Sequence, residues 1–260
     1  MNEKTQADLT LEFAQARRMN GIISEQTARS VKYFDQAYRL QQNVRTELAA
    51  QVIGWKIAVP PGAEALSAPI FDISCVDSHS VLANAELLRD GVECELAMRI
   101  DRPLPCGGCT REDVIAAVGA VIPAFELLSS RLPAKFASPP EHIVADCMGN
   151  GAVVLGAPCV DWQTLDLAQL KVTLWADDIR VVEKHCSNPF GDPLLAVALL
   201  ANHLALRGQA LGAGVFVMAG SHTGVYQARP NERLRCVFEG IGEVALEVCD
   251  TTLTTTFKGD

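Results

Sequence analysis

The sequence feature that most constrains the fold is an alternating segment in the first half of the chain, residues 92–100. Every second position there is apolar: Val92, Cys94, Leu96, Met98 and Ile100. Successive side chains of a β-strand point to opposite faces of a sheet, so this pattern predicts a strand with one buried face. Two acids begin the other face, Glu93 and Glu95, and they lie roughly 7 Å apart along such a strand.

Further strands are indicated after Val52 by short apolar segments separated by Gly, Pro and Asp. These segments are 54–59, 151–156, 171–175, 215–219, 234–238 and 244–248. Thr110 is placed to cap a helix running through Val121, which Pro123 ends or bends before another strand-like segment. A second helix begins at Asp192, with proline at its first position. Strands that do not alternate strictly with helices predict an α+β fold with a mixed or antiparallel sheet.

The first fifty residues have a different character. Apolar residues recur at helical spacing from 9 to 19 and again from 24 to 50, and Ser24 is a plausible N-cap of the second stretch. We therefore expect a helical N-terminal segment at 1–50 and a second unit at 51–260 that carries the chemistry.

Composition excludes several classes of protein. The 260 residues have a formal net charge of -9 and no basic stripe, which argues against nucleic acid as a partner. The apolar runs are shorter than the roughly 20 residues that span a bilayer, and no apolar leader opens the chain, so we expect no membrane association. Nine scattered cysteines, an odd number, fit a reducing cytoplasm better than a disulfide framework.

The acids of the central region admit two interpretations. Glu93 and Glu95 taken alone fit the solvated face of an edge strand, or a pair bridged by a hard cation. Glu126 is more informative because it interrupts the apolar run 121–128, and a buried carboxylate needs an arginine, several donors or a metal. Arg131 is the nearest candidate partner. Asp146 is a further acid at the end of an apolar stretch.

Six short motifs follow one another in a recognisable order. They are Gly54-Trp55-Lys56-Ile57, Glu93-Cys94-Glu95, Pro123-Ala124-Phe125-Glu126 with Ser130-Arg131, Val144-Ala145-Asp146, Gly191-Asp192-Pro193-Leu194, and the closing segment 239–244. In this order the chain resembles the 2-keto-4-pentenoate hydratase and 4-oxalocrotonate decarboxylase family of the fumarylacetoacetate hydrolase superfamily. The resemblance covers essentially the whole chain.

The resemblance implies a site and a fold. It implies Mg²⁺ or Mn²⁺ held by the three glutamates, Glu93, Glu95 and Glu126, and an all-oxygen ligand set independently favours such hard cations. It implies a curled mixed β-sheet, homo-oligomers, and an association with a neighbouring pathway enzyme.

The resemblance also implies roles for residues around the metal. Lys56 is placed as a catalytic and substrate-binding residue, and Asp146 as a second catalytic residue. Asp72 is a third catalytic candidate, and it lies about one position from the place where relatives carry another acid. Ser221 and His222 belong to a loop of small residues that family members place near the substrate, and both are candidates for substrate binding.

The expected reaction is hydration of 2-hydroxypenta-2,4-dienoate, or a substituted analogue, to a 4-hydroxy-2-oxo acid in aromatic-compound catabolism. The alternative is decarboxylation of 2-oxohex-3-enedioate, whose second carboxylate calls for an additional cation. The matched motifs offer only Lys56 and Arg131, which favours the hydratase. An acylpyruvate-type hydrolase would need a water-activating His-Glu pair, and here Glu141 and His142 are merely adjacent. A ligand-binding or scaffold protein on the same fold is the alternative that is not an enzyme.

Overall fold

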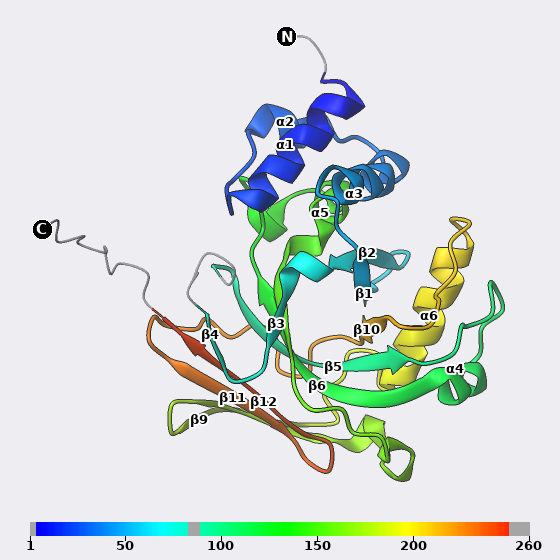
Figure 1. Ribbon diagram of the computed structural model, residues 1–260, viewed down its shortest axis with the longest axis vertical. Helices are drawn as coiled ribbons and strands as arrows, with labels where there is room; N and C mark the ends of the chain where they lie inside the picture. The colour runs from blue at the N-terminus through cyan, green and yellow to red at the C-terminus, as the bar shows by residue number, and fades with distance from the viewer. Residues whose placement is uncertain (1–3, 83–88, 250–260) are drawn as a thin grey trace, which may run out of the picture.

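The computed structural model describes residues 4–82 and 89–249, which form two β-sheets with helices at one end and along one side (Figure 1). The larger sheet has seven strands in the order β2-β1-β10-β5-β6-β7-β3. Their bounds are β1 Val52–Ala58, β2 Leu66–Phe71, β3 Cys75–Asp77, β5 Gly91–Ile100, β6 Val118–Leu128, β7 Asn150–Leu155 and β10 Phe216–Met218. The smaller sheet has the order β4-β12-β11-β8-β9. Its strands are β4 Ser80–Leu82, β8 Lys171–Ala176, β9 Ile179–His185, β11 Arg233–Phe238 and β12 Gly242–Val248.

The strand pairing is mixed. β1 with β10, β3 with β7 and β4 with β12 pair in parallel, and the remaining neighbours are antiparallel. The long pair β5 and β6 curves across the middle of the molecule (Figure 1). The predicted α+β fold with a curled mixed sheet is therefore confirmed.

The alternation that predicted β5 is confirmed in detail. All five apolar residues of its inner face are completely buried. They belong to the main core, where the two sheets face each other through residues such as Phe125 of β6, Leu174 of β8 and Phe238 of β11. Glu93 and Glu95 therefore lie on the opposite face of the large sheet, away from this core.

The helix that starts after Thr110 is shorter than predicted. The hydroxyl of Thr110 does cap α4, but this helix covers only Arg111–Ala117, and β6 begins at the next residue. Pairing with β5 along the whole length of β6 outweighs the helical spacing of the sequence. Pro123 is tolerated inside β6 because of its position in the ladder. Its carbonyl accepts from the amide of Gly156, just past the end of β7. Its missing N–H faces that same side, where the ladder ends.

Helices cover the end of the large sheet that carries β2 (Figure 1). They are α1 Gln6–Arg18, α2 Glu25–Arg29, α3 Phe34–Glu47 and α5 Pro140–Ala145. Ser24 caps α2 as predicted, but the helical stretch beyond it is interrupted before α3. The N-terminal helices share a core with the sheet domain through Phe71 of β2 and Val144 of α5.

The last helix, α6 Pro193–Ala205, has the predicted N-cap at Asp192, whose carboxylate accepts from the amide of Leu194. It lies beside α4 at one edge of the molecule (Figure 1). Within residues 4–82 and 89–249, no helix combines the length and the apolar character needed to cross a membrane.

Candidate active site

Three carboxylates converge on the face of the large sheet that points away from the main core. Glu93 and Glu95 lie on β5, and Glu126 lies on β6 directly opposite Glu93. Opposed residues of neighbouring strands point to the same face, so the three side chains meet. One oxygen from each lies within 4.8 Å of the others, which is the arrangement expected of a metal-binding group.

Glu126 is completely buried, and its two oxygens have different surroundings. Oε1 accepts from Nζ of Lys56 at 2.6 Å and from Nδ2 of Asn150 at 3.0 Å. Oε2 has no hydrogen-bond partner among the described residues. Oε2 of Glu95 accepts from the amide of Gly220 at 3.0 Å. The buried partner of Glu126 is therefore Lys56 and not Arg131.

The electrostatic balance of this cluster is unfavourable without a further cation. Burial, followed by the charges of Glu126 and Glu93, raises the pKa of Glu95 well above its ordinary value. Burial and Glu126 likewise raise the pKa of Glu93. Burial acts to lower the pKa of Lys56, but Glu126 and the other two acids outweigh it, and that pKa is raised. In the described part of the chain, one ammonium thus faces three carboxylates.

These residues fit a hard divalent cation. The ligand atoms are all carboxylate oxygens, which Mg²⁺, Mn²⁺ and Ca²⁺ prefer. The unpartnered Oε2 of Glu126 is a buried acceptor that otherwise lacks compensation. Glu93, Glu95 and Glu126 would hold the cation, and its charge would offset the repulsion between them.

A cavity of about 810 Å³ opens over the carboxylates. Its ionisable lining consists of Lys56 and the three glutamates. The rest is largely apolar and includes Ile57, Leu66, Phe136, Ile143, Phe190 and Leu199. This combination of a charged end and apolar walls is typical of a site for a small acid with a hydrocarbon tail.

Ser221 and His222 are neighbours in sequence but differ in their surroundings. Ser221 lines the cavity together with Glu93, and its hydroxyl accepts from the amide of Gly224. His222 is buried outside the cavity lining, where Nε2 accepts from Nδ2 of Asn188 at 3.1 Å and the ring packs edge-on against Phe238. Burial lowers the pKa of His222 to about 4, so its ring is neutral at pH 7.

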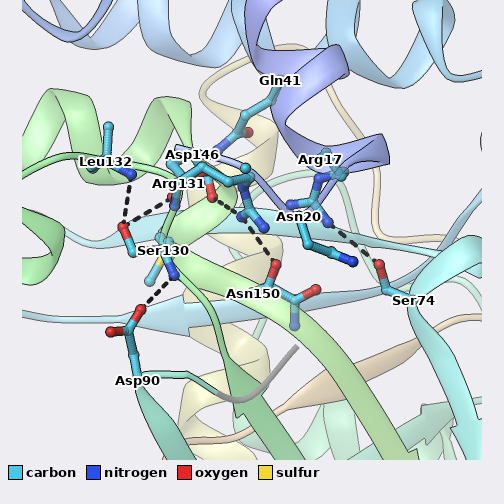
Figure 2. A network of polar contacts seen from close by, with 12 residues as sticks. Arg17, Asn20, Gln41, Ser74, Asp90, Ser130, Arg131, Leu132, Asp146 and Asn150 are labelled. Carbon is cyan, nitrogen blue, oxygen red and sulfur yellow. Dashed lines mark hydrogen bonds and ion pairs between the residues drawn. The ribbon is translucent and has the colours of Figure 1, made fainter. Parts of the chain in front are cut away.

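The two aspartates predicted as catalytic lie away from the cavity lining. Asp146 is buried in an ion pair with Arg131 and also accepts from the hydroxyl of Ser130 and the amide of Arg131 (Figure 2). Asp72 is exposed at the start of a short 3-10 helix, and its carboxylate accepts from the amides of Gln51 and Ile73. The geometry gives both acids local structural partners and does not bring them to the carboxylate cluster.

Sequence reasoning did not identify Asn150 as part of this site. Its carboxamide touches Glu126, although the residue opens an apolar strand far along the chain. The available signal was a polar residue entering an apolar run, the same signal that singled out Glu126.

The chain matches no family model. It is 30% identical over 223 residues to 4-oxalocrotonate decarboxylase of Pseudomonas putida, covering 82% of this chain and 84% of that one. It is 28% identical over 228 residues to 2-keto-4-pentenoate hydratase of Paraburkholderia xenovorans, covering 82% and 83%.

Among solved structures, 4-oxalocrotonate decarboxylase from Pseudomonas putida G7, complexed with magnesium and adipate, superimposes with a TM-score of 0.86. The match has 26% identity and covers 95% of this chain and all of that one. A fumarylacetoacetate hydrolase family protein from Yersinia pestis shares the fold, with a TM-score of 0.57 at 16% identity, over 76% of this chain and 93% of that one. The chain therefore belongs to the family of 4-oxalocrotonate decarboxylases and 2-keto-4-pentenoate hydratases, whose fold is that of the fumarylacetoacetate hydrolase superfamily.

Proposed function

We propose that this lyase is a hydratase that adds water to 2-hydroxypenta-2,4-dienoate, or to an analogue with an apolar tail, and yields a 4-hydroxy-2-oxo acid. The observation that supports this choice is the charge of the cavity. Lys56 is the single cationic side chain in the described part of its lining, and it lies against Glu126. A substrate with one carboxylate and a hydrocarbon tail suits such a cavity, because a distal carboxylate would be buried without a partner.

The reaction has two steps that balance without a redox partner. The proton of the 2-hydroxyl is transferred to C5, which converts the dienol into a 2-oxo-3-enoate. Water then adds across C3 and C4, with its oxygen on C4 and a proton on C3. A divalent cation bound by the three glutamates would supply Lewis-acid stabilisation to the 2-oxygen as negative charge develops there.

The side chains of this protein have distinct parts in those steps. Lys56 keeps its proton, since neighbouring acids raise its pKa, and it attracts the substrate carboxylate as a fixed positive charge. Ser221 lines the same end of the cavity and offers a hydroxyl to a substrate oxygen. The apolar walls, among them Phe136 and Leu199, hold the tail and limit access of bulk water.

The decarboxylase of 2-oxohex-3-enedioate is the second candidate. It is supported by the 30% identity to the Pseudomonas putida decarboxylase and by the TM-score of 0.86 to a structure of that activity. Both reactions use the same enolate at the 2-oxygen, so the three glutamates and Lys56 would serve either.

The deciding experiment follows ultraviolet absorbance with each substrate, in Mg²⁺, in Mn²⁺ and after chelation, while evolved CO₂ is measured. Loss of dienoate absorbance without CO₂, and its abolition by the chelator, is the expected result. Faster release of CO₂ from 2-oxohex-3-enedioate would replace the hydratase by the decarboxylase. Glu126→Gln should be inactive, whereas Glu243→Gln, at a surface ion pair with Arg235, is the matched control that should remain active.

We expect homo-oligomers that associate with a neighbouring pathway enzyme. Light scattering on the purified chain tests the first expectation, and co-purification with the enzyme that supplies the dienoate tests the second.

A further inference from the structure

The two oxygens of the Glu126 carboxylate are not equivalent, and the donors around them decide which is free. A carboxylate oxygen accepts about two hydrogen bonds. Oε1 already receives two, from Lys56 at 2.6 Å and from Asn150 at 3.0 Å, whereas Oε2 has no partner in the described part of the chain. The orientation of the Asn150 carboxamide follows from charge, because the flipped form would place its oxygen against the carboxylate.

Asn150 reaches Glu126 because of an irregularity in the sheet. Glu126 pairs with Val153, so a regular ladder would place residue 151 on the same face of β7 and Asn150 on the opposite face. The register shifts between Leu127 and Leu128, and Leu128 pairs with Asn150 instead. This β-bulge adds one residue to β7 and brings the Asn150 side chain to the face that carries the glutamates.

The turn before Asn150 is held by an independent set of contacts. Cys147, Met148 and Gly149 all have positive φ, at 50°, 53° and 70°. Two of these residues are not glycine, so the surrounding structure must enforce the conformation. Nη2 of Arg131 donates to the carbonyls of Asp146 and Asn150 at the two ends of the turn, at 2.9 Å and 3.1 Å (Figure 2).

The same turn contributes two contacts to the candidate metal centre. Its Met148 carbonyl accepts from Nζ of Lys56 at 3.1 Å, and the Asn150 side chain donates to Glu126. Arg131 and its partner Asp146 therefore affect the candidate metal centre indirectly, through the turn that Arg131 holds. This accounts for a buried ion pair close to the site but outside the cavity lining.

We infer that Asn150 is a positioning residue for metal binding: with Lys56 it fills Oε1 of Glu126, so that Oε2 alone is presented to the cation. The inference rests on the metal centre of the proposed function. It is independent of whether the reaction is hydration or decarboxylation.

The test measures Mn²⁺ binding to the metal-free protein by titration calorimetry, with no substrate present. Asn150→Ala removes the donor, and Asn150→Leu removes it while keeping the branched shape of the side chain. Loss of an outer hydrogen-bond partner typically weakens metal binding by about 10- to 100-fold, so we expect Mn²⁺ affinity to fall at least about tenfold in both variants. Asn202→Ala is the matched control, since its carboxamide also makes two hydrogen bonds, with the amide and carbonyl of Cys109, and neither residue lines the cavity. It should bind Mn²⁺ like the wild type.

A second measurement needs no variant. In a crystal structure of the wild-type protein with Mn²⁺, Glu126 should bind the ion through Oε2 alone, with Oε1 still held by Asn150 and Lys56. Ligation through Oε1, or through both oxygens, would overturn the inference even if the variants failed to fold. Folded variants with wild-type affinity would overturn it as well. If the wild type bound no divalent cation at all, the metal centre itself would be refuted, which is a different outcome.

Discussion

Replacing Lys56 by methionine should destabilise the metal-free protein strongly, because the site holds three carboxylates and this one ammonium. The side chain is buried, with its residue 8% exposed, and Nζ lies 2.6 Å from Oε1 of Glu126. Methionine keeps most of the length and apolar character of the lysine stem. The change therefore removes the charge and its hydrogen bonds with little loss of packing.

The expected size follows from the burial of both partners. Removing one partner of a buried ion pair costs about 3–5 kcal/mol, because the other charge stays buried without compensation. Glu126 is completely buried, so Lys56→Met should lie within that range at pH 8. The double variant Lys56→Met/Glu126→Gln should recover a large part of the loss, since Gln removes the completely buried charge that Lys56 pairs with.

The assay is urea unfolding in the presence of a chelator, followed by circular dichroism. The free energies of unfolding of the variant and the wild type are compared, provided that both have the same m-value. Lys171→Met is the matched control, because Lys171 forms a half-exposed ion pair with Glu183 and such pairs contribute about 0–1 kcal/mol. A loss below about 1 kcal/mol for Lys56→Met would refute the argument that this lysine compensates the glutamates. A double variant no more stable than the single one would refute it equally.

Three further results are expected. Glu95→Gln should weaken Mn²⁺ binding in calorimetry by more than the about tenfold expected for an outer partner, since it removes a ligand; equal affinity would exclude Glu95 from the centre. The pKa of His222 is lowered from 6.5 to about 4, so its contribution to stability is complete above pH 6.5 and is lost as the pH falls toward 4, by up to about 3 kcal/mol. His222→Gln, which keeps an acceptor for Asn188, should flatten that part of the curve of unfolding free energy against pH, and an unchanged slope would contradict the assignment. Asp146→Asn should lower the free energy of unfolding by about 3 kcal/mol in urea titrations, because it leaves Arg131 buried without its charge partner; a loss like that of a surface substitution would show that the ion pair is not structural.

The parts of the site that could be predicted from the sequence depend on strand periodicity. The alternation along β5 puts Glu93 and Glu95 on one face, and a period of two is fixed by backbone geometry. Glu126 could be identified because a charge inside an apolar run needs a compensating partner. The partner itself could not be identified, since Lys56 is 70 residues away and pairs with Glu126 only through the order of strands in the sheet.

The helix predicted beyond Ala117 shows the limit of the same reasoning. Val118 and Val121 fit helical spacing as well as a strand, and short apolar runs do not distinguish the two. Pairing with β5 decides in favour of the strand, and that pairing joins segments whose contact the sequence does not display.

The positions of Asn150 and Asp146 relative to the glutamates depend on a β-bulge and a turn, neither of which a sequence pattern indicates. Without the β-bulge, strand parity would turn Asn150 away from Glu126, and Lys56 would be the one remaining donor to Oε1 among the residues that the structure describes. A single extra residue in β7 thus reverses the face of Asn150, and the ion pair of Asp146 with Arg131 sustains the turn that leads into it. We expect the motif acid Asp146 to act on the glutamates through this turn, whose carbonyls bind Arg131, and not through its own carboxylate. Its effect on metal affinity should therefore be matched by Arg131→Met, because either substitution releases the same turn.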